Sequence, residues 1–304
     1  MSADDLRNLV PLRQLGHGTL CEVLLVEDSA GRRYALKRPL PDRRTPGVLR
    51  LLADEGRVAA QLAHPNIPRL VRAFDDALLF ELLDGVTLDE VLPKKTTVSG
   101  GEAAFLVGQV LDALAYVHSL PTAIIHRDVG PHNIVVTRSG DPALIDFGIA
   151  VDGERERWTA TGALRGTLGY LSPEAVRGEA IDARADVFAV AALLYRLLLG
   201  RRPFVGRGAR AILQAVAGGR FAAVDDPRLQ GLFERGLAAD PRRRFQSAQE
   251  LANAVAAIVG LGAERSAASD IDTDVTDDTA RRSWAARVAP LLPSSLQTRG
   301  LTLS

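Results

Sequence analysis

The sequence predicts an α+β fold of two lobes: a small lobe built on an antiparallel sheet with one key helix, and a larger, mainly helical lobe. Residues 9–38 alternate apolar and polar positions around glycine-rich breaks, which is typical of paired strands. From about residue 101 onward, apolar residues recur at helical spacing instead. The change of pattern places the junction of the lobes near Glu81 to Gly85.

Two further elements complete the predicted small lobe. Residues 46–63 are expected to form a helix, because Pro46 suits a first helical turn and apolar residues follow at helical spacing. The apolar run ALLFELL, residues 77–83, is expected to be a buried strand, and DGVTLDEVL leaves it through a turn.

The larger lobe begins with a long predicted helix. Its apolar face is formed by Leu106, Val110, Leu114 and Val117. The short apolar runs NIVV and ALID follow, and RSGD between them is typical of a turn that joins two strands. Helical patterns resume over residues 173–199 and continue, with loops, to about residue 261.

Composition and charge narrow the class of protein. Of the 304 residues, 47% are hydrophobic and 24% are charged, as in globular proteins that live in water. Lys+Arg and Asp+Glu both number 37, so the net charge provides no general attraction to nucleic acid or anionic membranes. The one cysteine, Cys21, excludes an internal disulfide framework and indicates a reducing, cytoplasmic environment.

No segment is expected to enter a membrane. The first ten residues, MSADDLRNLV, contain two aspartates and no apolar core, so we expect no signal peptide. The longest apolar run, VFAVAALLYRLLLG, is interrupted by Arg196 and is shorter than the roughly 20 apolar residues that a bilayer requires. We therefore expect a soluble protein without a transmembrane segment.

The composition shifts after residue 262. SDIDTDVTDDTARR is polar, acidic and without periodicity, so residues 262–304 are predicted to be a disordered acidic tail. Within this tail, Trp284, Val288 and Leu291 share a helical face near Arg281, Arg282 and Arg287. A short basic amphipathic helix that docks on a partner or a membrane surface is the alternative, but the mobile tail is the favoured interpretation.

A glycine-rich motif lies at the start of the small lobe. LGHGTLCEV, residues 15–23, places Gly16 and Gly18 directly before a predicted strand. Glycine allows the backbone to approach an anion closely and to adopt turn dihedrals that other residues resist. Taken alone, the motif would be an ordinary hairpin turn.

A buried ion pair is predicted near this motif. Lys37 lies within the next strand pattern, between apolar residues, where it either reaches the surface or pairs with a buried acid. Glu55 is on the same helical stripe as Leu51, Val58 and Leu62, so its carboxylate points toward the core and needs a partner. Asp54 lies on the opposite face of that helix, which favours Glu55 as the partner of Lys37.

The strongest chemical signal is between residues 126 and 148. Asp128 and Asn133 are five positions apart in HRDVGPHNIVV, and Asp146 follows in IDFG. Two acids and an amide that converge on one point can hold a divalent metal against phosphate oxygens while one acid accepts a proton. A single acid would more often be a cap or turn residue, but the joint spacing makes that interpretation improbable.

These motifs, in this order, resemble those of a eukaryotic-type (Hanks-type) protein kinase domain, and the chain is most similar to bacterial serine/threonine kinases. The resemblance covers residues 9–261, with a small lobe over 9–84 and a large lobe over 85–261. It implies transfer of the ATP γ-phosphate to serine or threonine hydroxyls of proteins. It also implies Mg²⁺, with Mn²⁺ as the alternative ion, and a homodimer in which one copy phosphorylates the other.

The resemblance assigns an ATP site to Leu15, Gly16, His17, Gly18, Val23, Ala35, Lys37, Phe80, Glu81, Leu83 and Val135. The two glycines would cover the phosphates, and Lys37 would contact the α- and β-phosphates while paired with Glu55. Phe80 would gate the back pocket, and the backbone of Glu81 and Leu83 would hydrogen-bond adenine. Asp128 would accept the substrate proton, while Asn133 and Asp146 would hold Mg²⁺.

The same resemblance implies structural and regulatory residues. Thr167, in GTLGYLSPE, is typical of serine/threonine kinases. Glu174 would pair with Arg244, and Asp186 would brace the catalytic loop, although without the resemblance Asp186 would be simply a helix N-cap. Arg127 precedes the catalytic acid, and such an arginine usually needs a phosphate on the activation segment. The predicted phosphorylation sites are Thr161 and, with less support, Thr159.

Two positions depart from the kinase pattern. Gly130 stands where most serine/threonine kinases have a lysine that contacts the γ-phosphate, and Cys21 replaces the third glycine of the phosphate cover. Losing one electrostatic donor slows an enzyme by about 10²–10³-fold without abolishing activity. His132 could substitute as a donor when protonated, but a surface histidine is the favoured interpretation. We therefore expect an active kinase.

Three alternatives stay open. A pseudokinase scaffold would use the same fold to bind nucleotide and partners without efficient turnover. A small-molecule phosphotransferase of the aminoglycoside type would share the two lobes but normally has glycine at the position of Arg127. A regulatory module would work through residues 262–304, which would then dock a partner on their own.

Overall fold

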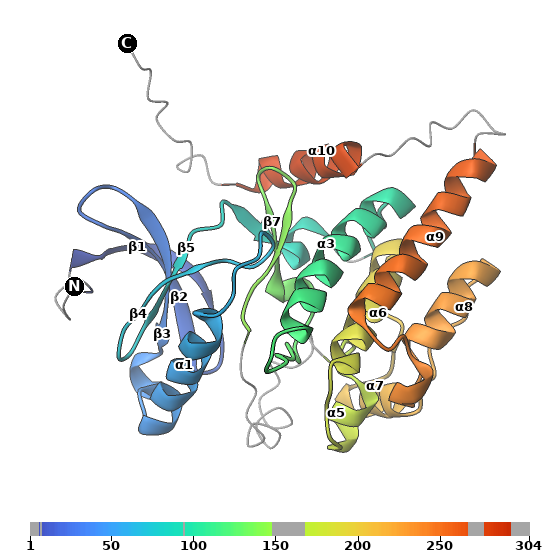
Figure 1. The fold of residues 1–304 in the computed structure, drawn as a ribbon, viewed down its shortest axis with the longest axis horizontal. Helices are drawn as coiled ribbons and strands as arrows, with labels where there is room; N and C mark the ends of the chain where they lie inside the picture. Colours follow the sequence, from blue (N-terminus) through green and yellow to red (C-terminus); the bar gives the residue numbers. More distant parts are fainter. Residues whose placement is uncertain (1–5, 7, 94, 148–167, 267–276, 293–304) are drawn as a thin grey trace, which may run out of the picture.

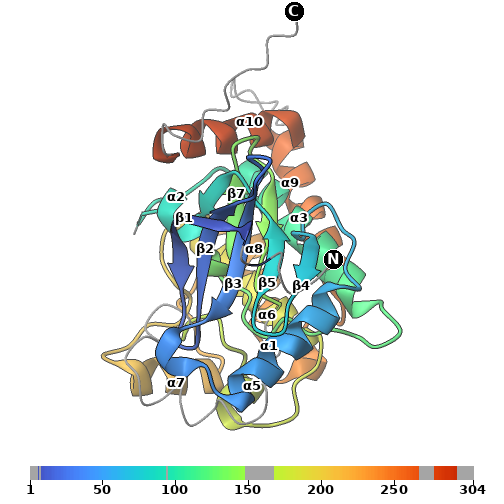
Figure 2. The same cartoon turned by 90° about the vertical axis from the view of Figure 1, so that its left-hand side faces the viewer.

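The computed structural model describes residues 6, 8–93, 95–147, 168–266 and 277–292. Figure 1 shows a small lobe, made of a sheet and one long helix, beside a larger lobe of packed helices. Figure 2 shows the strands of the small lobe side by side, with α1 running across their lower ends. This arrangement confirms the predicted α+β fold of two lobes.

The small lobe is a five-stranded antiparallel sheet with the order β1-β2-β3-β5-β4. Its strands are β1 Val10–His17, β2 Cys21–Glu27, β3 Arg33–Pro39, β4 Leu70–Ala73 and β5 Leu78–Glu81. Strand β4 was not predicted, because it has only four residues and none of them is fully buried. Such a short, half-exposed run carries little periodicity for a sequence pattern to reveal.

Helix α1, Pro46–Ala59, packs against this sheet. Its first turn is fixed by Pro46 and by the Thr45 hydroxyl, which accepts a hydrogen bond from the Val48 amide. The helix ends four residues earlier than the predicted residue 63, in a turn that leads to Pro65. Because proline restricts the residue before it to extended conformations, the helix could not continue through His64 into Pro65.

The larger lobe is organised around helices α3 and α6. Its helices are α2 Leu88–Val91, α3 Gly100–His118, α5 Pro173–Arg177, α6 Arg184–Leu199, α7 Ala209–Ala217, α8 Pro227–Gly236 and α9 Ala248–Ser266. Short 3-10 turns occur along the chain at η2 Pro41–Arg43, η3 Pro131–Asn133, η5 Pro241–Arg243 and η6 Ala289–Leu291. The four predicted apolar residues of α3 are at most 1% exposed. A capping box between Ser99 and Glu102 starts α3.

A second, three-stranded sheet lies in the larger lobe, close to its start. It contains β6 Gly85–Thr87, β7 Ile134–Thr137 and β8 Pro142–Leu144, in that order. The predicted pair NIVV and ALID corresponds to β7 and β8. DGVTLDEVL, predicted to be a turn, instead forms β6 and α2, and Glu90 closes a capping box with Thr87 between them.

Residues 277–292 contradict the favoured prediction of a disordered tail and agree with its alternative, a short helix in this region. They include helix α10, Asp277–Val288, which lies across α3 and the β7–β8 hairpin (Figure 1). Trp284 and Val288 are fully buried, and the Trp284 indole Nε1 donates a hydrogen bond of 3.0 Å to the Glu102 carbonyl. Leu291, predicted to share this face, is instead 45% exposed.

The composition of this segment did not predict its order, because the residues that hold α10 in place belong to α3. The Glu102 carboxylate accepts hydrogen bonds from Ser283 and Arg287, and Arg281 pairs with Asp141 beside β8. Gly140 of the hairpin has φ +91°, and a side chain there would place Cβ 2.0 Å from the Arg281 carbonyl oxygen. The basic side of α10 is therefore bound by this chain itself.

Acid is expected to weaken the attachment of α10. Burial opposes ionisation of Glu102, but hydrogen bonds from Ser283 and Ser99, together with the charge of Arg287, lower its pKa below the ordinary value of 4.5. A carboxyl whose pKa is lower in the folded state stabilises that state above its unfolded pKa and loses the contribution as the pH falls through the folded pKa. Glu102→Gln should therefore cost about 1–3 kcal/mol at neutral pH and progressively less below about pH 4.5.

Urea unfolding of both proteins across this pH range measures the difference. The exposed glutamate Glu234 of α8 provides the matched control Glu234→Gln, which should cost little at any pH. A cost for Glu102→Gln that is independent of pH would show that the carboxylate charge does not hold α10.

Candidate active site

One face of the small-lobe sheet gathers the predicted nucleotide-binding side chains. Val23 lies directly opposite Lys37 in the β2–β3 pair, and Ala35 lies opposite Phe80 in the β3–β5 pair. Opposed residues share a face, and so do residues two apart along a strand. Val23, Ala35, Lys37 and Phe80 therefore project from the same side of the sheet.

Lys37 connects the two lobes. Its ammonium Nζ is 2.7 Å from Glu55 Oε1 on α1 and 2.9 Å from Asp146 Oδ1 in the larger lobe. Burial opposes the positive charge, but the carboxylates of Asp146 and Glu55 outweigh it and raise the Lys37 pKa. The charge of Lys37 in turn lowers the Asp146 pKa. The site therefore holds Lys37 as a fixed cation, which can donate charge-assisted hydrogen bonds to phosphate oxygens.

The remaining predicted nucleotide contacts lie at the end of β1 and in the connection between the lobes. Leu15, Gly16 and His17 end β1, and the Gly18 amide donates to the Cys21 carbonyl in the turn that follows. A side chain at Gly16 would meet no atom within 4 Å, so packing inside the chain does not require glycine there.

The segment between the lobes carries further predicted nucleotide contacts. Glu81 ends β5, and Leu83 lies in the connection that leads from Glu81 to β6. Gly85 lies opposite Thr137 in the β6–β7 pair, and a Cβ at Gly85 would collide with the Val136 carbonyl oxygen and lie 2.8 Å from Val135 Cγ1. Glycine at position 85 thus allows this connection to pass closely over Val135.

Buried Asp186 supports the backbone of the catalytic loop. Its carboxylate accepts hydrogen bonds of 2.8 Å from the amides of His126 and Arg127, and His118 Nε2 is 2.8 Å away. Asp186 lies in the first turn of α6, whose N-cap is Ala183, so its side chain serves the loop rather than the helix end. The structure therefore does not support the N-cap alternative.

Two residues of the site have left-handed backbone conformations. Arg127 has φ 68° and Asp146 has φ 59°, and Lys95 is the other non-glycine residue with positive φ in the described ranges. Such conformations cost about 1–3 kcal/mol and persist only where the surroundings enforce them. The contacts of Asp186 and Lys37 provide that enforcement.

Asp128 is held from one side only. Its Oδ2 accepts hydrogen bonds from Asn133 Nδ2, at 3.0 Å, and from His132 Nε2, at 3.1 Å. Its Oδ1 is buried and has no hydrogen-bond partner among the described residues. One carboxylate oxygen thus accepts two hydrogen bonds, and the other has no hydrogen-bond partner among the described residues.

His126 and His132 were missed as site residues. His126 is 1% exposed, its Nε2 lies 2.9 Å from the Ile145 carbonyl, and its ring packs edge-on against Phe147. It therefore ties the catalytic loop to the segment that carries Asp146. His132, interpreted from sequence as a surface residue, instead turns its ring toward Asp128. Both histidines lie inside the motif HRDVGPHN, and this position in the sequence could have marked them as candidate site residues.

The donor set at this point suits magnesium. Asn133 Nδ2 donates to Asp128, so Asn133 Oδ1 is the amide atom that could bind a cation, and Asp146 contacts Lys37 through Oδ1. Mg²⁺ is usually bound through one or two such oxygens plus substrate phosphates. The described residues contain no cluster of three or more His, Cys, Asp or Glu that would form an all-protein metal cage.

A buried ion pair stabilises the larger lobe below the site. Arg244 Nη1 and Nη2 donate to Glu174 Oε1 and Oε2 at 2.7 and 2.6 Å, and both side chains are almost fully buried. This pair fixes α5 to the segment before α9. The predicted sites Thr159, Thr161 and Thr167 lie outside the described residues.

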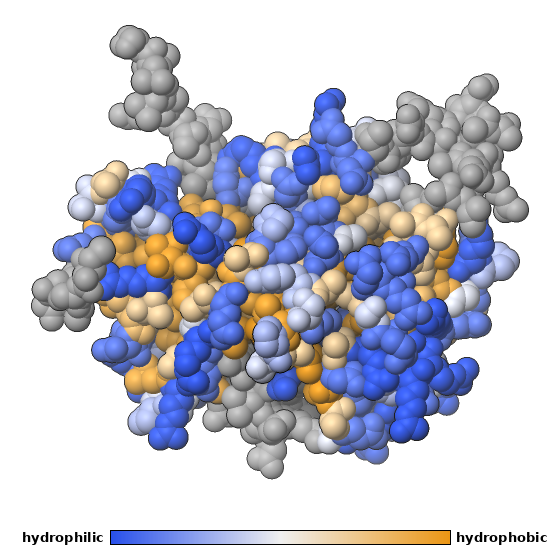
Figure 3. Space-filling view, viewed as in Figure 1, coloured by the Kyte–Doolittle hydropathy of each residue, from blue (hydrophilic) through white to orange (hydrophobic). Residues whose placement is uncertain are grey.

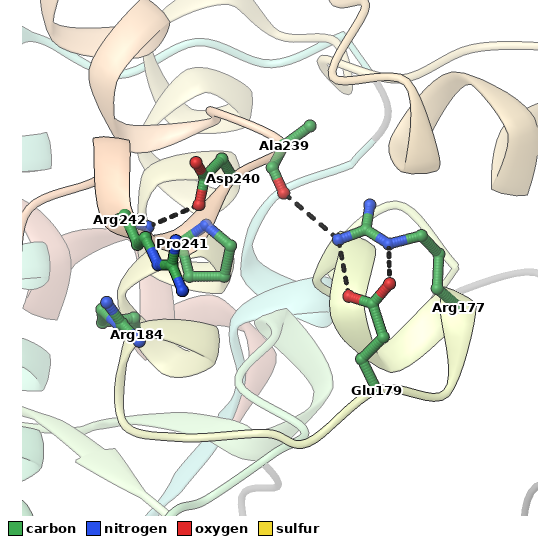
Figure 4. Close-up of a pocket in the computed structure, with 7 residues that line it drawn as sticks. All are labelled: Arg177, Glu179, Arg184, Ala239, Asp240, Pro241 and Arg242. Atoms are coloured by element: carbon green, nitrogen blue, oxygen red, sulfur yellow. Dashed lines mark hydrogen bonds and ion pairs between the residues drawn. The ribbon is translucent and has the colours of Figure 1, made fainter.

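A separate shallow pocket on the larger lobe has no part in this site. Figure 4 shows that Arg177 faces Glu179 across one side of the pocket, while Asp240 accepts a hydrogen bond from the Arg242 amide on the other. Its lining contains none of the predicted catalytic residues. Figure 3 shows hydrophilic residues dominating this region and apolar residues gathering over the small lobe.

None of the helices formed by the described residues is long and apolar enough to cross a bilayer. This finding agrees with the interpretation of the apolar run in α6 as a core helix, since most of its residues are buried in the larger lobe.

Comparison with known proteins agrees with the geometry. Residues 9–254 match the family model described as "Protein kinase domain". The serine/threonine-protein kinase PknB of Mycolicibacterium smegmatis is 33% identical over 78% of this chain and 40% of its own length. PrkC of Bacillus subtilis, a serine/threonine-protein kinase, is 31% identical over 79% of this chain and 39% of its own. The tyrosine-protein kinase MasK of Myxococcus xanthus is 30% identical over 81% of this chain and 42% of its own length. The chain spans about two fifths of the length of these relatives.

Proposed function

The chain belongs to the protein kinase family, and on that premise we propose that it is an active serine/threonine kinase. It would transfer the γ-phosphate of ATP to hydroxyl groups of protein substrates, including its own activation segment. The observation that supports this proposal is the arrangement of Lys37, Asp128 and Asp146, in which Lys37 contacts Glu55 and Asp146 while Asn133 donates a hydrogen bond to Asp128.

In this proposal the residues have three roles: phosphate binding, proton acceptance and metal binding. Lys37, held by Glu55, binds phosphate oxygens as a fixed cation. Asp128, whose carboxylate is held by Asn133 and His132, orients the substrate hydroxyl and accepts its proton. Asn133 and Asp146 would hold Mg²⁺, which when bound neutralises the charge that develops on the phosphates.

Substrate class and location follow by inference. Phosphoryl transfer of this type requires a flexible protein segment that brings a hydroxyl to Asp128. The single cysteine of the sequence is consistent with a reducing compartment, so we propose cytoplasmic proteins as substrates. A second copy of this chain is the first candidate, because Thr159 and Thr161 lie in its own activation segment.

Autophosphorylation with γ-labelled ATP and Mg²⁺ tests the proposal. Wild-type protein should incorporate label on Thr159 or Thr161, and Asp146→Ala should incorporate none, because that change removes a metal ligand and the partner of Lys37. The exposed aspartate Asp112 on α3 provides the matched control Asp112→Ala, which should label normally.

Hydrolysis of the labelled protein identifies the acceptor. We expect phosphothreonine or phosphoserine, because Thr167 in GTLGYLSPE is typical of kinases that act on these residues. Phosphotyrosine alone would place the chain with MasK in specificity. Absence of label from folded protein that still binds ATP would contradict the proposal and favour a pseudokinase scaffold.

A further inference from the structure

The backbone conformation at Gly130 does not require a glycine. Gly130 has φ −168° and ψ 170°, an extended conformation that any residue adopts without strain. A side chain at this position would, however, place Cβ 2.8 Å from His132 Cε1 and 3.0 Å from His132 Nδ1. The space beside Gly130 is therefore already filled by the ring of His132.

The His132 ring uses this space to reach Asp128. The turn η3 brings position 132 back toward position 128, and Nε2 lies 3.1 Å from Asp128 Oδ2. A carboxylate only accepts hydrogen bonds, so Nε2 carries the proton of this contact in either the neutral or the charged imidazole. The side chain is 33% exposed, and Asp89 of α2 and Asp146 also face it.

The contact changes what Asp128 can do. With His132 and Asn133 both donating to Oδ2, rotation of the carboxylate would break two hydrogen bonds. The arrangement therefore keeps Oδ1 pointed in one direction. Correct orientation of a proton acceptor matters because misplacement by about 1 Å can slow a reaction by about 10²-fold.

We propose that His132 is a positioning residue that fixes the Asp128 carboxylate, and that Gly130 and His132 form one unit. In this unit the glycine leaves room for the imidazole, which contacts Asp128 and not the γ-phosphate that a lysine at position 130 would contact. The inference deepens the proposed kinase function and assigns a role to the departure at Gly130. It also predicts that changes at the two positions depend on each other.

Steady-state kinetics of four variants test the unit. His132→Ala should lower kcat by about 10–100-fold, with the KM for ATP changed less than about threefold, because positioning affects the chemical step rather than nucleotide binding. His132→Gln should recover most of the loss, since its amide N–H can also donate to Asp128. Gly130→Ala should lower kcat about as much as His132→Ala, because its methyl group displaces the ring.

The double variant Gly130→Ala/His132→Ala is decisive. If the two residues act as a unit, it should be no slower than either single variant. Independent, multiplying losses would overturn the proposal, and so would an unchanged kcat in His132→Ala. The control is His64→Ala, which removes another histidine that faces an aspartate, Asp112, far from the loop along the chain, and should leave kcat unchanged.

A measurement without catalysis separates this inference from the kinase proposal. In protein labelled with ¹⁵N-histidine, the Nε2–H resonance of His132 should shift in both Gly130→Ala and Asp128→Asn. This result is expected even if wild-type protein proves inactive, because the contact exists in the chain without nucleotide. A His132 resonance unaffected by either change would overturn the inference while leaving the autophosphorylation result intact.

Discussion

Asp128→Asn is expected to lower the kcat of phosphoryl transfer by about 10²–10⁴-fold, the usual contribution of a positioned general base. The amide oxygen of asparagine can still accept the hydrogen bonds that Asn133 and His132 donate to Oδ2. The group that replaces Oδ1, however, is an N–H donor that cannot take a proton from the substrate hydroxyl. The change therefore removes the proton acceptor and little else.

Rapid-quench measurement of a single turnover reports the chemical step directly, and thermal unfolding reports the fold. The variant should unfold within a few degrees of wild type, and Asp112→Asn should match wild type in both measurements. Activity within threefold of wild type would show that Asp128 is not the proton acceptor, whatever the other loop residues do.

Glu174→Ala is expected to destabilise the protein by about 3–5 kcal/mol, because it leaves a charged guanidinium unpaired in the core. The Arg244 side chain is completely buried and makes two charge-assisted hydrogen bonds to Glu174. Arg244 also donates to the Ala238 and Arg184 carbonyls and lies over the Phe188 ring, so it has no route to water.

Urea unfolding measures this loss, and a double variant tests its cause. Glu174→Leu/Arg244→Met removes both charges and should cost clearly less than the sum of the single changes. The exposed pair of Arg282 and Asp278 on α10 provides a control, in which Arg282→Ala should cost about 0–1 kcal/mol. A cost below about 1 kcal/mol for Glu174→Ala would show that the lobe relaxes to hydrate Arg244.

The lobes could be predicted because their signals are local. The predicted apolar residues of α3 recur at helical spacing, and the structure buries all four of them. The strands β1 to β3 could be located from their alternating pattern between glycine-rich breaks, although β1 is exposed along most of its length. The contact between Lys37 and Glu55 could be inferred for the same reason, since a carboxylate on the inner face of α1 needs a buried cation.

The missed features depend on residues that are distant in sequence. The stretch that contains α10 resembles a mobile tail in sequence, and the acceptors for Ser283 and Arg287 are provided by Glu102, more than 180 positions earlier. The direction of the His132 ring depends on the absence of a side chain at Gly130, which no periodicity reports. Sequence patterns predict elements better than they predict which side chains fill the spaces between elements.

Helix α10 also changes where the independent folding unit ends. The family match stops at residue 254, yet the surface of α3 is completed only by residues 277–292. A chain truncated at residue 254 would expose to water the apolar seat of Trp284 and Val288, and it would leave Glu102 without two of its hydrogen-bond donors. Such an exposed patch favours self-association. We therefore expect a stable fragment of this protein to include α10 and to extend to Leu292.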